Sequence, residues 1–371
     1  MRRTCRLSTI GWEEFQGLGV VEKAPLLRDQ AGRLYHVLLA QQFDREALEA
    51  LGRLATQIRR IAKQEAGLTF LRGRLPNQRA MLYFTQPSSR TFLSFCAACH
   101  ILGIHIGEVR DTATSSEFKG ESQEDSVRTF SSYFDLIIMR TQTGGLAERM
   151  AWVLSNTERP VPIINAGSGK DQHPTQALLD VYTLQYSFHR RGGIDGKTVV
   201  FVGDLARGRT VRSLAWLLTN YRDVTQYFVA PPELQIGADI LELLQRAGVR
   251  TVLTDDLPAA IPQADAIYMT RIQDEWDATP GESRRIDTTR FHFRAEHLRA
   301  LKPEAVIMHP FPRRQEIAVE VDRDPRAVYW RQMRNGMWIR AALMATIFGR
   351  EGEIADYYRR RVAHRTEDAS A

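Results

Sequence analysis

Short apolar runs that alternate with helical segments constrain the fold of this chain more than any other feature. The runs AMLYF (80–84), LIIMR (136–140) and TVVFVGD (198–204) are largely apolar, and a helical segment from Pro174 to about Phe188 lies between two of them. Further runs of this kind are VPIIN (161–165), TQYFVA (225–230), TVLTD (251–255), AIYMTR (266–271) and AVIMHP (305–310). Strands that are apolar on both faces are typical of parallel sheets covered by helices on each side. The sequence therefore predicts an α/β fold with two doubly wound parallel-sheet domains.

A turn-rich stretch, RRGGIDGK (190–197), separates the two series of strands. Two helices, the one from Pro174 and a last one from about Asn335, are expected to join the domains. The predicted division of the chain is an N-terminal extension at 1–32, a first domain at 33–185 completed by the C-terminal helix 336–365, and a second domain at 186–335.

The composition excludes several classes of protein. Of 50 basic residues only six are lysine, but no dense basic run with interleaved aromatic residues is present, which disfavours a nucleic-acid partner. Scattered arginines suit small anionic substrates, because guanidinium binds carboxylate and phosphate bidentately. No apolar stretch is long enough to span a membrane, and the N-terminus has no apolar run typical of a signal peptide. We therefore expect a cytoplasmic protein with no membrane partner.

Polar residues gather where the predicted strands end, which is where ligands bind in open parallel sheets. Nearly all of these side chains are hydrogen-bond donors, so the pattern favours an anion with several negative charges. The set comprises Ser88, Ser89, Arg90 and Thr91 after the first strand, Arg140, His173, Gln176, Arg209, Arg271, Gln273 and the segment HPFPRR (309–314).

The first of these groups has a physical mechanism for holding phosphate. Pro87 disfavours helix before it, and Ser88 or Ser89 can cap the helix that follows. The N–H groups and dipole at the start of that helix then favour an anion, and Arg90 adds a positive charge. An ordinary capped helix without a ligand is the alternative interpretation.

Three other motifs indicate different chemistry, and each fails on its context. CAACH (96–100) has the C-x-x-C-H pattern of haem attachment, but Cys96 and Cys99 fall on one apolar helical face with Phe92 and Phe95, so both are expected in the core. GSGK (167–170) lacks the earlier glycine and the Ser/Thr of a P-loop, and FVGDLARG lacks G-x-G-x-x-G. We expect no metal and no cofactor.

Five motifs in order resemble the aspartate/ornithine carbamoyltransferase family over about residues 33–350. Ser88-Ser89-Arg90-Thr91-Phe92 is similar to the family's S-T-R-T-R, and His173-Pro174-Thr175-Gln176 to its H-P-x-Q. The other three are SSEFKGES (115–122), similar to the family's mobile loop, R-x-Q at 271–273 and H-P-x-P-R at 309–313, which favour the aspartate branch. Ser89 in place of threonine keeps the hydroxyl, whereas Phe92 in place of the second arginine removes a charge.

The resemblance implies a division into a carbamoyl-phosphate domain (33–185) and an aspartate domain (186–335). It implies transfer of the carbamoyl group from carbamoyl phosphate to L-aspartate for pyrimidine biosynthesis. Arg90, Thr91, Arg140, His173 and Lys119 are the implied catalytic residues. Carbamoyl phosphate would contact Ser88, Ser89, Arg90, Thr91, Arg140, His173, Gln176, Ser115, Phe311 and Pro312. Aspartate would contact Lys119, Arg209, Arg271 and Gln273.

The resemblance also implies a homotrimer in which Ser115 and Lys119 reach into a neighbouring subunit's active site. Regulatory or dihydroorotase chains are further potential partners. Two alternatives remain at this stage: a carbamoyltransferase with another amine acceptor, and a catalytically silent relative that acts as a scaffold or regulatory partner. Arg271 argues against a cationic acceptor, and the presence of Arg90, Lys119 and His173 argues against a silent relative. The role of 1–32 and the consequence of Phe92 are left open.

Overall fold

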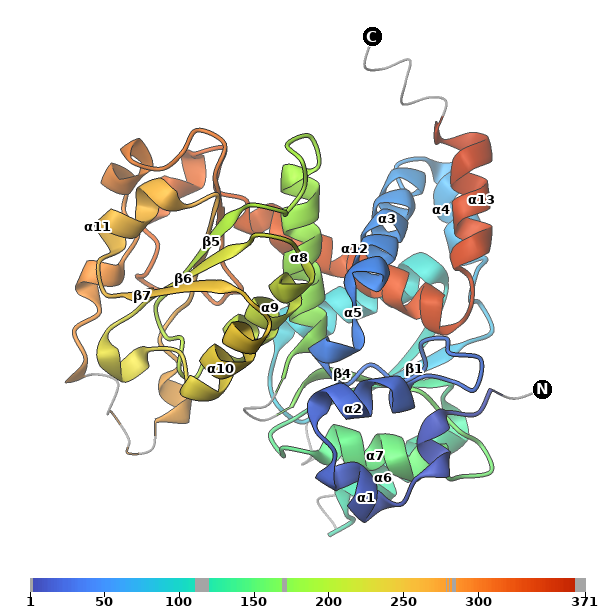
Figure 1. The fold of residues 1–371 in the computed structure, drawn as a ribbon. Helices are drawn as coiled ribbons and strands as arrows, with labels where there is room; N and C mark the ends of the chain where they lie inside the picture. The colour runs from blue at the N-terminus through green and yellow to red at the C-terminus, as the bar shows by residue number, and fades with distance from the viewer. Residues whose placement is uncertain are drawn as a thin grey trace. The chain divides into compact units, whose positions relative to one another are not determined.

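The computed structural model describes residues 3–110, 120–168, 172–277, 279, 281 and 285–363. The chain divides into two compact units: unit 1 is formed by 1–175 with 336–371, and unit 2 by 176–335. Each unit contains one parallel sheet with helices, so the predicted fold class is confirmed (Figure 1). The unit boundaries fall inside two helices, α8 (Pro174–Phe188) and α12 (Tyr329–Ile347), which are the two helices that the sequence predicted to link the domains. Which substrate each domain binds stays a prediction.

The sheet of unit 1 has four parallel strands in the order β2-β1-β3-β4. These strands are β1 (Arg79–Phe84), β2 (His105–Val109), β3 (Leu136–Thr141) and β4 (Ile163–Ser168). Strands β3 and β4 are buried throughout and β1 is buried beyond Arg79, as their apolar sequences require. The edge strand β2 was not predicted, because its sequence HIGEV places exposed His105 and Glu108 among half-buried residues.

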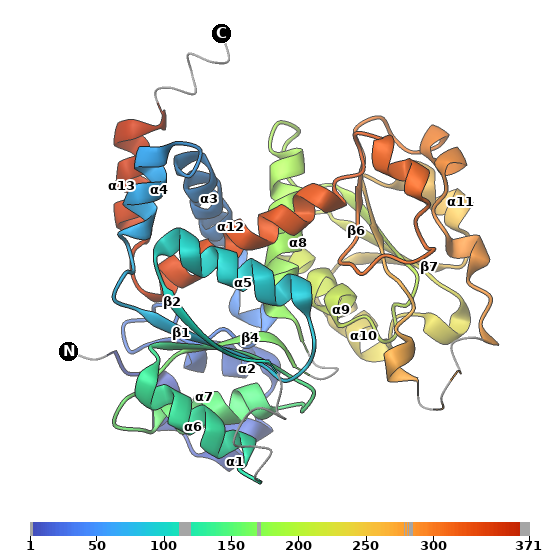
Figure 2. The same ribbon diagram turned by 180° about the vertical axis from the view of Figure 1, so that it is seen from behind.

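Helices cover both faces of this sheet. Figures 1 and 2 show α6 (Gln123–Tyr133) and α7 (Leu146–Ser155) on one face and α5 (Ser89–Leu102) on the other. The remaining helices of unit 1 are α1 (Trp12–Gly17), α2 (Val20–Lys23), α3 (Arg45–Ile61), α4 (Glu65–Arg72) and α13 (Glu351–Arg361). Among the described residues, no helix is long and apolar enough to cross a membrane.

The N-terminal extension packs against unit 1. Cys5, Phe15 and Leu27 are fully buried in the same apolar cluster as residues of β3 and α7. The indole N–H of Trp152 donates to the carbonyl of Ile10 at 2.9 Å, and Lys23 pairs with Glu148 at 2.7 Å. These contacts make the described part of the extension a layer of unit 1's core.

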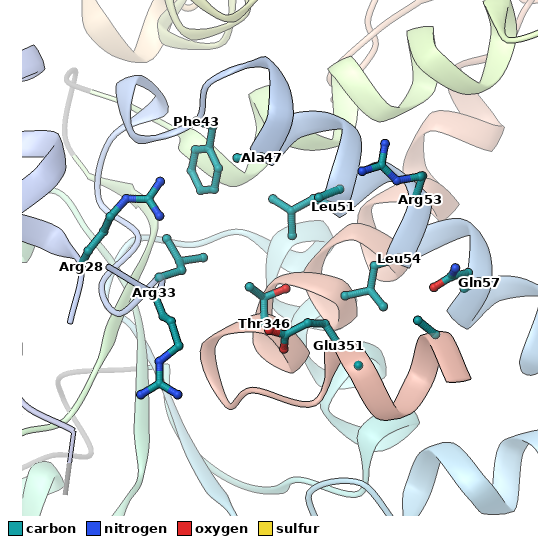
Figure 3. A pocket seen from close by; sticks show the side chains of 14 residues that line it. Arg28, Arg33, Phe43, Ala47, Leu51, Arg53, Leu54, Gln57, Thr346 and Glu351 are labelled. Carbon is teal, nitrogen blue, oxygen red and sulfur yellow. The ribbon is translucent and has the colours of Figure 1, made fainter. Parts of the chain in front are cut away.

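A cavity of about 460 Å³ opens between this extension, α3 and the start of α13 (Figure 3). Its lining includes the apolar side chains of Leu51 and Leu54 and the charged side chains of Arg28 and Arg33. Arg28 donates to the carbonyls of Gly32 and Gln42, and Arg33 pairs with Asp29, so both guanidinium groups bind the chain itself. None of the predicted site residues lines this cavity.

The sheet of unit 2 has five parallel strands in the order β7-β6-β5-β8-β9. The strands are β5 (Thr198–Val202), β6 (Thr225–Val229), β7 (Arg250–Thr254), β8 (Ala266–Met269) and β9 (Val306–Met308). The helices are α9 (Arg209–Leu217), α10 (Ala238–Arg246) and α11 (Leu257–Ala260), with the parts of α8 and α12 noted above. The strand order reverses at β5, between β6 and β8, and ligands bind at such a switch point in open α/β sheets.

Candidate active site

The first group of predicted residues lies at the start of α5. Ser88 is the N-cap residue with an extended backbone (φ −164°), and the helix begins at Ser89. The expected capping bond is absent: the Ser88 hydroxyl accepts no hydrogen bond from a backbone N–H of the first turn. Ser89 and Arg90 are exposed and Thr91 is buried. The start of this 14-residue helix therefore presents backbone N–H groups beside three hydroxyls and a guanidinium, which suits a phosphate.

A cavity of about 260 Å³ adjoins this helix start and is lined by Phe84, Pro87, Ser88 and Arg110. Phe92 is buried edge-to-face against Phe84, with ring centroids 5.4 Å apart. The guanidinium of Arg110, which follows β2, lies over the Phe92 ring at 4.4 Å. The side chain at position 92 thus packs inward, and a positive charge above it comes from Arg110 instead.

Arg140 and His173 meet at a glycine at the end of β4. Gly167 has φ +117°, and a Cβ there would lie 2.6 Å from Nη1 of Arg140 and 3.4 Å from Cδ2 of His173. Nη1 of Arg140 also donates to the carbonyl of Ala166 at 3.1 Å. The guanidinium and the imidazole are only 9% and 5% exposed, so they form a compact pair of buried donors beside β3. Only glycine leaves room for them.

The backbone connects this pair to the start of α5. Strands β1 and β3 are neighbours, with Phe84 paired to Arg140. The N–H of Gln86 donates to the carbonyl of Arg140 at 3.3 Å. The segment that leads into Ser88 is therefore held next to Arg140, as expected for residues at one edge of a parallel sheet.

The C-x-x-C-H segment belongs to the packing of α5. Cys99 is fully buried, and burial raises the pKa of its thiol well above the usual range. Cys96 is only half-buried, so the prediction that both cysteines lie in the core is wrong for Cys96, and His100 is exposed. Within the described ranges, no group of three His, Cys, Asp or Glu side chains is arranged to hold a metal ion.

In unit 2, Arg209 and Arg271 follow two neighbouring strands. Arg209 is the first residue of α9 and only 9% exposed, and Arg271 lies two residues after β8, which pairs with β5. Nη1 of Arg271 contacts Oε2 of Glu275 at 2.8 Å and donates to the carbonyl of Ile272 at 2.6 Å. Burial is the largest single influence and acts to raise the pKa of Glu275, but the hydrogen bond and positive charge of Arg271, together with a backbone hydrogen bond, outweigh it, and the pKa lies below its usual value. Sequence reasoning missed this partner.

Asp204 was a second residue that the sequence analysis did not single out. It follows β5, is fully buried, and accepts from the backbone N–H of Gln273 at 3.0 Å and of Arg207 at 3.2 Å. Burial raises the pKa of this carboxyl. It fixes the backbone that carries Arg271 and Gln273. The signal in the sequence was an acidic residue at the end of an apolar run.

The segment after β9 is shaped by His309. Phe311 has φ +57°, which is rare outside glycine, and the Phe311–Pro312 peptide bond is cis. The N–H of Phe311 donates to Nδ1 of His309 at 2.8 Å, and Nε2 of His309 contacts Oε1 of Glu316 at 2.7 Å. Burial is the largest single influence and acts to raise the pKa of Glu316, but the contact with His309 and the backbone N–H of Arg314 together outweigh it, and the pKa is lowered.

Gln176 lies on α8, one turn before Asp180. Asp180 is a third residue that sequence reasoning missed. Nε2 of Gln176 donates to Oδ1 of Asp180 at 3.0 Å. The same carboxylate accepts from the Tyr268 hydroxyl and from Nε2 of Gln332, both at 2.7 Å. Asp180 is fully buried. Its carboxylate is held by donors from α8, β8 and α12.

In unit 1 the structure brings together the start of α5, Arg140 and His173. In unit 2, Arg209 and Arg271 follow two neighbouring strands, β5 and β8. Ser115 and Lys119 lie outside the described residues. Both groups are rich in donors and fit anions.

Comparisons with known proteins agree on one family. A model described as "Aspartate/ornithine carbamoyltransferase, carbamoyl-P binding domain" matches residues 35–186, and one described as "Aspartate/ornithine carbamoyltransferase, Asp/Orn binding domain" matches 195–347. Aspartate carbamoyltransferase 1, chloroplastic, of Pisum sativum is 42% identical over 332 residues, which are 88% of this chain and 82% of the pea protein.

A solved structure and a larger protein are also similar. Aspartate transcarbamoylase from Trypanosoma cruzi, crystallised with N-(phosphonacetyl)-L-aspartic acid, is 37% identical with a TM-score of 0.75, and the match covers 84% of this chain and 95% of that chain. Multifunctional protein CAD of Squalus acanthias is 41% identical over 318 residues, which are 85% of this chain and 13% of that protein.

The contact of Gly167 with Arg140 gives a direct test of the site in unit 1. Gly167→Ala should displace the Arg140 guanidinium, because the new Cβ would lie 2.6 Å from Nη1. We expect the affinity for inorganic phosphate, measured by calorimetry, to fall about tenfold or more, the factor for one hydrogen bond to a charged group. The matched control is Gly145→Ala, where φ is +73° and no atom lies within 4 Å of the new Cβ. Equal phosphate affinity in folded Gly167→Ala protein would remove Arg140 from the site.

Proposed function

The chain belongs to the aspartate/ornithine carbamoyltransferase family, and from this membership we infer the role of each site residue in the reaction. It transfers the carbamoyl group of carbamoyl phosphate to the α-amine of L-aspartate, which yields N-carbamoyl-L-aspartate and phosphate. The observation that carries this conclusion is the match of both family domains, over 35–186 and 195–347, together with 42% identity to the pea enzyme over most of both chains. We assign the reaction to pyrimidine biosynthesis.

Carbamoyl phosphate is assigned mainly to unit 1. The start of α5 offers backbone N–H groups, the hydroxyls of Ser88, Ser89 and Thr91 and the guanidinium of Arg90 to the phosphate. Arg140, held beside this segment through the carbonyl that accepts from Gln86, supplies a second guanidinium. Charge-assisted bonds of this kind are about twice as strong as neutral ones, which suits a phosphate dianion.

The carbonyl oxygen of the carbamoyl group is assigned to Thr91, Arg140 and His173. These donors lie where negative charge develops when the aspartate amine attacks, so they stabilise the tetrahedral intermediate. The uncharged amine attacks and the C–N bond forms. The bond from the carbonyl carbon to the phosphate oxygen then breaks, and phosphate leaves with that electron pair and takes up the proton that the amine loses. Orienting two bound reactants lowers the barrier by about 7–11 kcal/mol without a protein nucleophile.

The amide nitrogen of the carbamoyl group needs acceptors, which are assigned to unit 2. The side-chain Oε1 of Gln176 is one, because its Nε2 is already committed to Asp180. The carbonyl groups of Phe311 and Pro312 are the others, in the segment that His309 shapes.

Aspartate is assigned to Arg209, Arg271 and Gln273, with Lys119 outside the described residues. Arg271 is 15% exposed and already lies against Glu275, so an incoming carboxylate replaces or shares an existing ion pair. This arrangement favours an acceptor with two carboxylates over a cationic one, because an amine with an extra positive charge would be repelled.

We propose a homotrimer with shared active sites, to which Ser115 and Lys119 of a neighbouring subunit contribute. The proposal is supported by the resemblance of SSEFKGES to the family's mobile loop. Association with regulatory chains or a dihydroorotase is a further proposal, and similarity to a multifunctional protein of the shark is consistent with it. The cytoplasm is the proposed location, although the pea relative is chloroplastic.

Acceptor kinetics test the substrate assignment. With carbamoyl phosphate and a panel of amines, wild-type protein should release phosphate fastest with L-aspartate and slowly with L-ornithine. Arg271→Ala should raise the KM for aspartate about 100-fold, since it removes a bidentate carboxylate contact worth about 3 kcal/mol, with a much smaller change for carbamoyl phosphate. Arg290→Ala, which breaks an exposed pair with Asp255, is the control and should change neither constant. Unchanged aspartate kinetics in Arg271→Ala would refute the assignment.

Subunit mixing tests the shared site. Arg90→Ala and Lys119→Ala proteins should each be nearly inactive, and their mixture should regain activity, because some hybrid sites then combine an intact Arg90 with an intact Lys119 from the neighbour. Phosphate release is measured before and after exchange, and exchange is verified with differently tagged subunits. No recovery after verified exchange would contradict the shared trimeric site.

A further inference from the structure

A continuous chain of hydrogen bonds in unit 2 connects Gln176 to Phe311. Nε2 of Gln176 donates to Oδ1 of Asp180 at 3.0 Å, and Nε2 of Gln332 donates to the same oxygen at 2.7 Å. Oε1 of Gln332 accepts from the N–H of His309 at 2.9 Å, and Nδ1 of His309 accepts from the N–H of Phe311 at 2.8 Å. The first four of these residues are at most 6% exposed, so the chain is built into the core.

The chemistry of Asp180 dictates the direction of every bond in this chain. An ionised carboxylate only accepts, so both glutamine amides must turn their NH₂ groups toward it. Gln332 then presents Oε1 to the N–H of His309, which the structure shows. Gln176 is left with Oε1 as its acceptor, and among the described residues no donor to that oxygen occurs.

The hydrogen bonds of His309 extend this chain to the loop after β9, which contains Phe311 and Pro312. Because Nδ1 accepts from Phe311, the ring proton lies on Nε2, where Glu316 accepts it at 2.7 Å. The N–H of Phe311 is thereby fixed, in a residue whose own φ is +57°. The carbonyls of Phe311 and Pro312 are therefore positioned through the same chain that orients Gln176.

We propose that Asp180 and Gln332 are positioning residues that set the specificity for a carbamoyl group over other acyl groups. The proposal rests on the function proposed above, in which Gln176 and the loop carbonyls accept hydrogen bonds from the carbamoyl –NH₂. A site built to bond a substrate N–H rejects an analogue that lacks it, because its acceptors are left unpaired. Neither residue touches the substrate, and their effect is to hold acceptors from α8 and from the loop after β9 in one geometry.

Two stable ligands of nearly equal shape test this proposal. Phosphonoacetamide ends in –C(O)NH₂, and 2-oxopropylphosphonate ends in –C(O)CH₃. Wild-type protein should bind the amide about tenfold more tightly by calorimetry, the factor expected for one to two net hydrogen bonds. Gln332→Met removes both bonds of that side chain at similar volume, and should reduce the preference to about twofold or less with unchanged affinity for the methyl ketone.

Substitutions at Asp180 separate hydrogen bonding from charge. Asp180→Asn should keep the preference, because Oδ1 of asparagine can accept from both glutamines while its NH₂ donates to the Tyr268 oxygen. Asp180→Leu should lose it. Asn335→Ala is the matched structural control, since it breaks another buried bond between α12 and α8, from Nδ2 to Oγ1 of Thr183 at 3.0 Å, without touching the chain. It should lower the melting temperature and keep the preference.

The outcomes separate this inference from the proposed function. A preference that survives in Gln332→Met, or that is lost equally in Asn335→Ala, overturns the positioning role. A wild-type protein that turns over carbamoyl phosphate with aspartate but shows no preference between the two ligands also overturns it, and the function stands. A wild-type protein without that turnover contradicts the function itself. Where Asp180→Leu does not fold, the comparison of Gln332→Met with Asn335→Ala decides.

Discussion

The buried carboxylate of Asp180 connects three elements of unit 2, the helices α8 and α12 and the strand β8. A charge removed from water is costly unless its oxygens are satisfied, and here both are, by Gln176 and Gln332 on one oxygen and Tyr268 on the other. Those donors come from α8, α12 and β8, so the carboxylate specifies how two helices and a strand meet. The boundaries between the two units also lie in α8 and α12, the two helices that Asp180 connects through its bond with Gln332.

Three arginines of the two units are held by fixed acceptors. Arg271 lies against Glu275, and Arg207 contacts Asp277 at 2.6 Å. Arg140 instead donates to the carbonyl of Ala166. Guanidinium groups held in this way lose little freedom when an anion arrives, and preorganised donors contribute most to stabilising developing charge. The same principle explains Gly167, which is required so that Arg140 and His173 can lie against the backbone.

The sequence predicted the elements whose pattern is local and missed those whose role depends on distant partners. Strands such as β3 were found because they begin with an apolar run and are buried throughout, whereas β2 was missed because this edge strand combines exposed and half-buried residues. The motif residues were found by type and spacing. Asp180 and Glu275 were missed because a single acidic residue has no pattern, and Asp204 was missed because its position at the end of an apolar run does not reveal its partners, which are chosen by tertiary packing. Ser88 shows the limit of local rules. It occupies the N-cap position of α5, but its hydroxyl makes no capping hydrogen bond.

We propose that the protein binds a phosphate group and aspartate at the same time. Calorimetry with N-(phosphonacetyl)-L-aspartic acid, the compound present in the Trypanosoma cruzi structure, tests it most directly. The account predicts one molecule bound per chain, about 10²–10⁴-fold more tightly than phosphonoacetate or succinate alone, because linking two bound anions makes the second contact intramolecular. Affinity no greater than that of the tighter fragment would contradict it, since the two anions would then occupy separate sites.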